Sequence, residues 1–102
     1  MHANAVRYHV PEDCRAAFRA AWEERHALLR AQDGFVDLAI QGLEGGSVVR
    51  VTTRWASRGA FVSWIASPAV NRVSMPEGVT QYAPEKGSKS LPDQYVPFVT
   101  LA

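Results

Sequence analysis

The chain has 102 residues, 47% of them hydrophobic and 21% charged, which excludes a disordered or fibrous protein and predicts one globular domain over residues 1–102. Eleven basic residues stand against ten acidic ones and are scattered along the chain, so no nucleic-acid partner is expected. No apolar run approaches the ~20 residues that a membrane-spanning helix needs, so no membrane association is expected.

Hydrophobic periodicity predicts four strands and two helical segments. In chain order these are a strand over 3–10, a helix from Pro11 to about Gln32, strands over 35–43 and 48–55, a helix after Ser57 that breaks before Pro68, and a strand over 95–101. Asp33-Gly34 ends the first helix, because glycine readily takes the left-handed conformation found at helix C-termini. Ser57 and Ser67 have the side chains that helix N-caps favour, and a proline follows Ser67.

The last third of the chain is less regular. Residues 74–93 are rich in Pro, Gly, Ser and Lys and have no hydrophobic period, so we expect a functional loop or a lid there. The final strand contains Pro97, which cannot donate a hydrogen bond to a neighbouring strand. This strand is therefore expected at an edge of the sheet or at a bulge.

The order of the elements predicts the fold class. Two strand-helix-strand units around a hairpin give an α+β, ferredoxin-like β-α-β-β-α-β fold, a four-stranded antiparallel sheet with both helices on one face. We expect the helices to cover the face that carries Val51 and Val36, and Phe35 and Tyr95 to lie on the uncovered face. Exposed aromatic residues on a sheet are commonly covered by a second subunit, so a homodimer is predicted.

The segment that begins at Trp55 carries the most specific motif. It reads W-A-S-R-G-A-F-V-S-W-I-A-S-P and resembles the W-x-S-x-x-A-F-x-x-W-x-x-S-P stretch of the antibiotic-biosynthesis-monooxygenase family. Phe18 and Trp22 in the first helix are similar to the same family, and the resemblance extends over residues 3–72. The resemblance implies a dimeric α+β barrel that acts as a monooxygenase.

Two branches of that family bear on the chemistry. One resembles cofactor-independent oxygenases of phenolic polyketides. The other comprises heme-degrading monooxygenases, which use an Asn on the first strand, a Trp on the second helix and an axial His ten residues later. Asn4 and Trp64 fall at the first two positions, and Ser74 stands at the third. We therefore expect no metal and no cofactor, with heme as the less favoured alternative.

Six residues are candidates for the site. We predict Asn4, Trp64 and His26 as catalytic residues and Tyr8, Trp22 and Phe61 as substrate-binding residues. N–H donors on Asn4 and Trp64 could stabilise a developing oxyanion, and His26 is the candidate base because histidine titrates near neutral pH. A purely structural role stays open for each. Asn4 could hydrogen-bond water or backbone near the end of its strand, and the aromatic residues could pack in the core. His26 could lie at the solvent-exposed edge of its helix.

These observations predict a cofactor-independent monooxygenase of a small aromatic molecule, phenolic or quinone-like. One alternative is a heme-binding or heme-degrading relative whose iron ligand lies elsewhere, and the other is a non-catalytic dimeric ligand-binding or stress-response module. The sequence contains no motif for a metal site, a nucleotide phosphate or a nucleophilic serine. One cysteine and an opening segment unlike a signal peptide predict a cytoplasmic protein.

Overall fold

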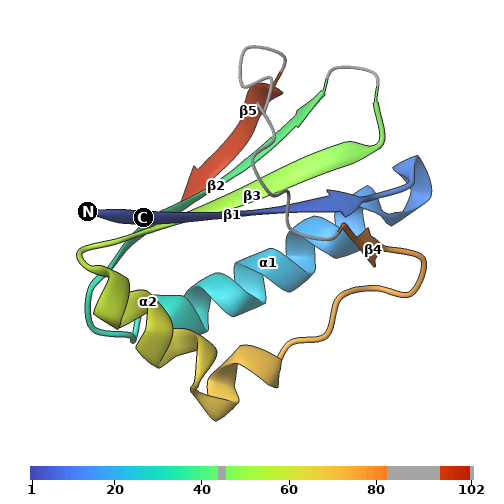
Figure 1. Ribbon diagram of the computed structural model, residues 1–102. Helices are drawn as coiled ribbons and strands as arrows, with labels where there is room; N and C mark the ends of the chain where they lie inside the picture. Colours follow the sequence, from blue (N-terminus) through green and yellow to red (C-terminus); the bar gives the residue numbers. More distant parts are fainter. Residues whose placement is uncertain (44–45, 83–94, 102) are drawn as a thin grey trace.

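The computed structural model describes residues 1–43, 46–82 and 95–101 (Figure 1). Its strands and helices are β1 (His2–His9), α1 (Arg15–Leu29), β2 (Phe35–Leu43), β3 (Val48–Trp55), α2 (Arg58–Ile65), β4 (Thr80–Gln81) and β5 (Tyr95–Leu101). The strand order is β4-β1-β3-β2-β5, and all neighbours are antiparallel. Both helices lie on one face of the sheet, so the predicted α+β, ferredoxin-like arrangement is confirmed (Figure 1).

The sheet differs from the prediction in strand number. The expected four strands become five in the described part of the chain, because Thr80–Gln81 forms a short strand beside β1. Part of the stretch expected to lack structure therefore pairs with the sheet, while residues 83–93 of that stretch lie outside the described residues. The last strand lies at the opposite edge, against β2, with a register shift opposite Ile40 and Gln41. Both expectations raised by Pro97, an edge and a bulge, are confirmed.

The helix boundaries follow local signals. A short 3₁₀ turn, Glu12–Cys14, precedes α1, and the helix ends at Leu29 rather than near Gln32. Both serine caps are confirmed: the Oγ of Ser57 accepts a hydrogen bond from the Ala60 amide at 3.2 Å, and Ser67 caps the following 3₁₀ turn in the same way. In the described part of the chain, no helix is long and apolar enough to cross a membrane.

A bulge changes the faces of β2. The register shifts between Phe35 and Asp37, so that Phe35 stands opposite Trp55 on the helix side. The centroid of its ring lies 5.5 Å from that of Trp55. The prediction that Phe35 lies on the uncovered face is therefore wrong, because the residue inserted at the bulge interrupts the period-two alternation on which it relied. The side chain of Tyr95 lies outside the described part of the structure.

Gly34 connects α1 to the sheet in a conformation that favours glycine. Its φ is 84°, and a Cβ at this position would lie 2.6 Å from the Cβ of Ala60 in α2. Gly34→Ala is therefore expected to lower the free energy of unfolding by about 2–4 kcal/mol, from left-handed strain and overpacking together. Urea denaturation of the purified variant measures this loss.

Gly59 is the matched control for this substitution. A Cβ there would meet only the Oγ of Ser57, at 3.8 Å, and the residue lies inside α2. Gly59→Ala is expected to raise stability by about 0.5–1 kcal/mol through helix propensity. Equal denaturation midpoints for the two alanine variants would contradict the proposed close approach of Gly34 to α2.

The uncovered face of the sheet carries a bidentate ion pair. The Arg54 guanidinium donates two hydrogen bonds to the carboxylate of Asp37, one of them 2.6 Å long. The hydrogen bond from Arg54 is the main cause that lowers the pKa of Asp37 below its ordinary value. A carboxylate whose pKa is lowered by folding stabilises the folded state at any pH above its unfolded-state pKa, which is about 3.9 for aspartate. This stabilisation disappears as the pH falls through the folded-state pKa.

This pair predicts a pH-dependent stability difference. The wild-type protein is expected to be more stable than Asp37→Asn at neutral pH, and the difference is expected to shrink as the pH falls below about 4. Urea denaturation of both proteins at a series of pH values is the measurement. A difference that stays constant down to strongly acidic pH would show that the charge of Asp37 does not stabilise the fold.

Candidate functional site

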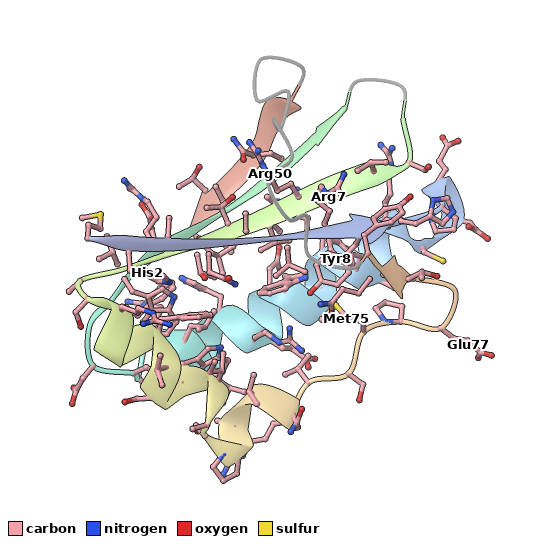
Figure 2. The ribbon with its side chains drawn as sticks, in the orientation of Figure 1. His2, Arg7, Tyr8, Arg50, Met75 and Glu77 are labelled. Atoms are coloured by element: carbon pink, nitrogen blue, oxygen red, sulfur yellow. The ribbon has the colours of Figure 1, made fainter. Side chains whose placement is uncertain are left out.

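Three polar or aromatic side chains from β1 and α1 meet between the sheet and the helix. We call Tyr8, Trp22 and Arg25 the donor cluster. The ring centroids of Tyr8 and Trp22 lie 6.2 Å apart in an edge-on arrangement, and the Arg25 Cζ lies 4.7 Å from the centre of the Trp22 ring. Figure 2 shows Tyr8 extending from β1 on the side of α1, while Arg7 and Arg50 lie on the opposite side of the sheet. The cluster therefore combines a cation with two amphipathic rings.

Two donors of this cluster have no acceptor within the described residues. The indole Nε1 of Trp22 and the Nε of Arg25 are both buried and form no hydrogen bond there, and Trp22 is only 5% exposed. Another nitrogen of Arg25, Nη2, donates to the carbonyl oxygen of Val73 at 2.8 Å. A buried donor without an acceptor costs about 1–3 kcal/mol. The arrangement therefore favours an added acceptor, above all a negatively charged oxygen.

The protonation state of Tyr8 is set by its burial. Loss of solvent raises the pKa of the phenol, and the charge and hydrogen bond of Arg25 act in the opposite direction with a smaller effect. Because the net shift is upward, Tyr8 stays neutral at physiological pH. It can therefore donate a hydrogen bond to a ligand, but it is a poor base.

A segment that we call the strap, residues 73–79, lies against the donor cluster. Val73 is 8% exposed and accepts the hydrogen bond from Arg25, and Met75 and Val79 pack against the core. Figure 2 shows Met75 on the side of the strap that faces the sheet and Glu77 pointing outward. We therefore expect the strap to limit the access of a ligand to the buried donors from this side.

A second group of aromatic residues surrounds Trp55 near α2. The Trp55 ring is stacked on Trp64 with centroids 6.4 Å apart, and its centroid lies 6.2 Å from that of Phe61. Its indole N–H donates to the Oγ1 of Thr53 at 3.1 Å. Asn4 stands directly opposite Thr53 in the pairing of β1 with β3. Trp64 is 6% exposed and belongs to the packed core.

The six predicted site residues are thus divided between two places. Tyr8 and Trp22 lie together in the donor cluster. Trp64 and Phe61 both contact Trp55, and Asn4 is paired with Thr53 on the neighbouring strand. His26 packs against Phe35, with ring centroids 5.9 Å apart. Their catalytic and binding roles stay predictions. Sequence reasoning missed Arg25, although it follows Trp22 by three residues and this spacing places both on one helix face.

The residues do not fit the heme ligation that the heme-degrading branch implies. Ser74, which stands where the axial histidine is expected, is exposed and has no imidazole. The three histidines are engaged elsewhere: His2 packs on Phe61, His26 on Phe35, and the Nδ1 of His9 lies 3.1 Å from the Oγ of Ser47. Over residues 1–43, 46–82 and 95–101, no three His, Cys, Asp or Glu side chains gather in a way that could hold a metal ion.

Comparison with known proteins identifies the family. Residues 1–74 match the model of the family described as antibiotic biosynthesis monooxygenase. Neither the curated proteins nor the solved structures contained a match to the chain. The matched range covers β1 through α2 and all three members of the donor cluster. Since the match spans well over half of the chain, the protein belongs to the antibiotic biosynthesis monooxygenase family.

Proposed function

We propose that this protein is a cofactor-independent monooxygenase that oxidises a small phenolic molecule at the donor cluster. Family membership supports the broader statement, a monooxygenase-like or small-molecule-binding function. The observation that carries the proposal is the pair of buried donors, on Trp22 and Arg25, without an acceptor among the described residues. A phenolate oxygen would satisfy both donors and balance the charge of Arg25.

The proposed reaction draws its electrons from the substrate. A phenol with an unsubstituted para position and one molecule of dioxygen give a quinone and one molecule of water. The ring anion reduces dioxygen, one oxygen atom forms the new C=O bond at that carbon, and the other leaves as water with the two hydrogens that the phenol loses. No external reductant is needed, so the protein has to bind the anion, orient the ring and exclude water.

Each member of the cluster has a defined task in this scheme. The positive charge of Arg25 favours ionisation of the bound phenol, and its Nε–H together with the Nε1–H of Trp22 holds the resulting oxyanion. Tyr8 packs beside the ring and remains a neutral donor because burial raises its pKa. His26 lies outside the cluster, about one helical turn after Trp22 on α1, and stays the predicted base that accepts the phenolic proton.

Oxygen uptake with 1-naphthol and with anthrone tests the proposal. The wild-type protein is expected to consume one dioxygen per quinone formed, and isotopically labelled oxygen gas should place one labelled atom in the product. Trp22→Phe keeps the ring and removes one donor, so kcat is expected to fall about 100-fold. Arg25→Gln should cause a similar loss, whereas Arg30→Gln, an exposed position beyond the end of α1, should leave turnover unchanged.

Each outcome decides between the candidate functions. Full turnover by Trp22→Phe would place the chemistry outside the donor cluster. If the wild-type protein consumes no oxygen with either phenol, it is titrated with heme and then reduced in air. A saturable Soret band that bleaches would support the heme alternative. Saturable naphthol binding without oxygen uptake would support a non-catalytic ligand-binding module.

We also propose that the protein forms a homodimer through the uncovered face of the sheet. This face carries the small exposed residues Ala3 and Ala5, which permit close approach of a second chain, together with the ion pair of Asp37 and Arg54. Sedimentation equilibrium measures the mass in solution. Ala5→Arg is expected to shift the protein to the monomer, and a monomeric wild-type protein would refute the proposal.

A further inference from the structure

The structure contains a half-open groove on the helix side of the sheet that shares no donor atom with the donor cluster. Its volume is about 400 Å³, and it lies between the first turns of α1 and strands β2 and β3. Its floor includes Val10, Ile40 and Val49, each at most 3% exposed. None of the six predicted site residues lines it. Its size falls within the range of small-molecule sites, about 300–1,000 Å³.

Two arginines stand over this apolar floor. Arg15 and Arg19 lie one helical turn apart on α1 and both line the groove. The guanidinium of Arg15 donates to the carbonyl oxygen of Gly46, which holds this side chain near the hairpin between β2 and β3. Arg19 pairs with Glu23 at 3.1 Å, and both side chains are more than half exposed. Such an exposed pair is worth at most about 1 kcal/mol, so an incoming anion can replace Glu23.

We propose that this groove is a second ligand site, specific for an apolar molecule that carries one carboxylate or sulfonate group. The apolar part would cover the floor of the groove, and the anionic group would bind Arg19 at the rim, close to Arg15. The site is separate from the proposed chemistry because Trp22 and Arg25 take no part in it. Phe18 connects the two places, since it lines the groove and its ring centroid lies 5.2 Å from that of Tyr8.

The test uses anilinonaphthalene sulfonate, a fluorescent aromatic sulfonate, with the purified full chain. The wild-type protein is expected to bind one molecule saturably. Arg19→Gln should weaken binding about tenfold, because one charge-assisted hydrogen bond is lost. Arg30→Gln makes the same change of charge away from the groove and should bind as the wild type does. Ala16→Trp, which fills the groove from α1, should abolish binding.

Three results would overturn the proposal. The first is equal affinity in Arg19→Gln and Arg30→Gln. The second is binding that survives in Ala16→Trp, provided that circular dichroism shows the variant folded. If that variant does not fold, the wild-type protein is titrated with the probe and its amide NMR signals are followed instead. Unchanged chemical shifts of the Ile40 and Val49 amides would then contradict binding in the groove. The third is weakened binding in Trp22→Phe but not in Arg19→Gln, which would place the probe in the donor cluster.

Discussion

Trp55→Ala is expected to lower the free energy of unfolding by about 3–5 kcal/mol, a large part of the 5–15 kcal/mol typical of a whole domain. The Trp55 side chain is fully buried. Its ring contacts Phe35, Phe61 and Trp64, and its indole N–H donates to Thr53. The substitution would leave a large cavity at the contact of β2, β3 and α2, and it would remove the indole donor of Thr53 at the same time.

Urea denaturation followed by circular dichroism measures this effect, with Trp55→Phe as the control. Phenylalanine keeps an aromatic ring in the core and loses the indole N–H and part of the volume, so a smaller loss of about 1–2 kcal/mol is expected. A loss below about 1 kcal/mol for Trp55→Ala would mean that the surrounding residues collapse into the space. It would contradict the central role of Trp55 in packing the end of the sheet against α2.

The second large effect concerns access to the donor cluster, and it rests on the proposed function. A Cβ at Gly78, next to the end of the strap, would lie 3.3 Å from the Sγ of Cys14. A sulfur carried on this Cβ could therefore come close enough to the Sγ of Cys14 to form an S–S bond of about 2.0 Å. Gly78→Cys should therefore allow oxidation to tie the strap to the start of α1. Oxidation of this variant is expected to abolish oxygen uptake with 1-naphthol, and a reductant should restore it.

The thiol chemistry and the backbone at Gly78 determine how this experiment is run. Desolvation is the main cause that raises the pKa of Cys14, so oxidation is best carried out at mildly alkaline pH. Because Gly78 has a φ of 95°, any side chain introduces strain, and Gly78→Ser serves as the control with the same strain and no cross-link. Full turnover by the oxidised cysteine variant, with the disulfide verified by mass spectrometry, would show that the strap does not control access.

Several features of the fold could be predicted because they depend on neighbouring residues. The strands and helices follow from hydrophobic periods of two and of three to four residues. The caps at Ser57 and Ser67 are local choices of side chain, and both are confirmed. Gly34 has the expected left-handed backbone, but α1 already ends at Leu29, so Gly34 is not the residue that ends the helix. The restriction that Pro97 places on the last strand also acts locally.

The candidate site was harder to predict, since its parts come from distant segments. Arg25 lies 48 positions before Val73, the residue whose carbonyl it binds, and Tyr8 reaches the cluster from β1. The spacing of Trp22 and Arg25 could have indicated one helix face. Neither the burial of their N–H groups nor the lack of an acceptor among the described residues can be inferred from spacing.

The sequence by itself determined the α+β class, the order of the elements, the local caps and turns, and the family, because these depend on residue periodicity and on a motif within one continuous segment. Only the tertiary structure decided which face Phe35 occupies, where the last strand pairs, and how β1, α1 and the strap enclose two buried donors. The physical reason is that a bulge, an edge pairing and a buried polar group are decided by contacts between residues far apart in the chain, which local patterns do not encode.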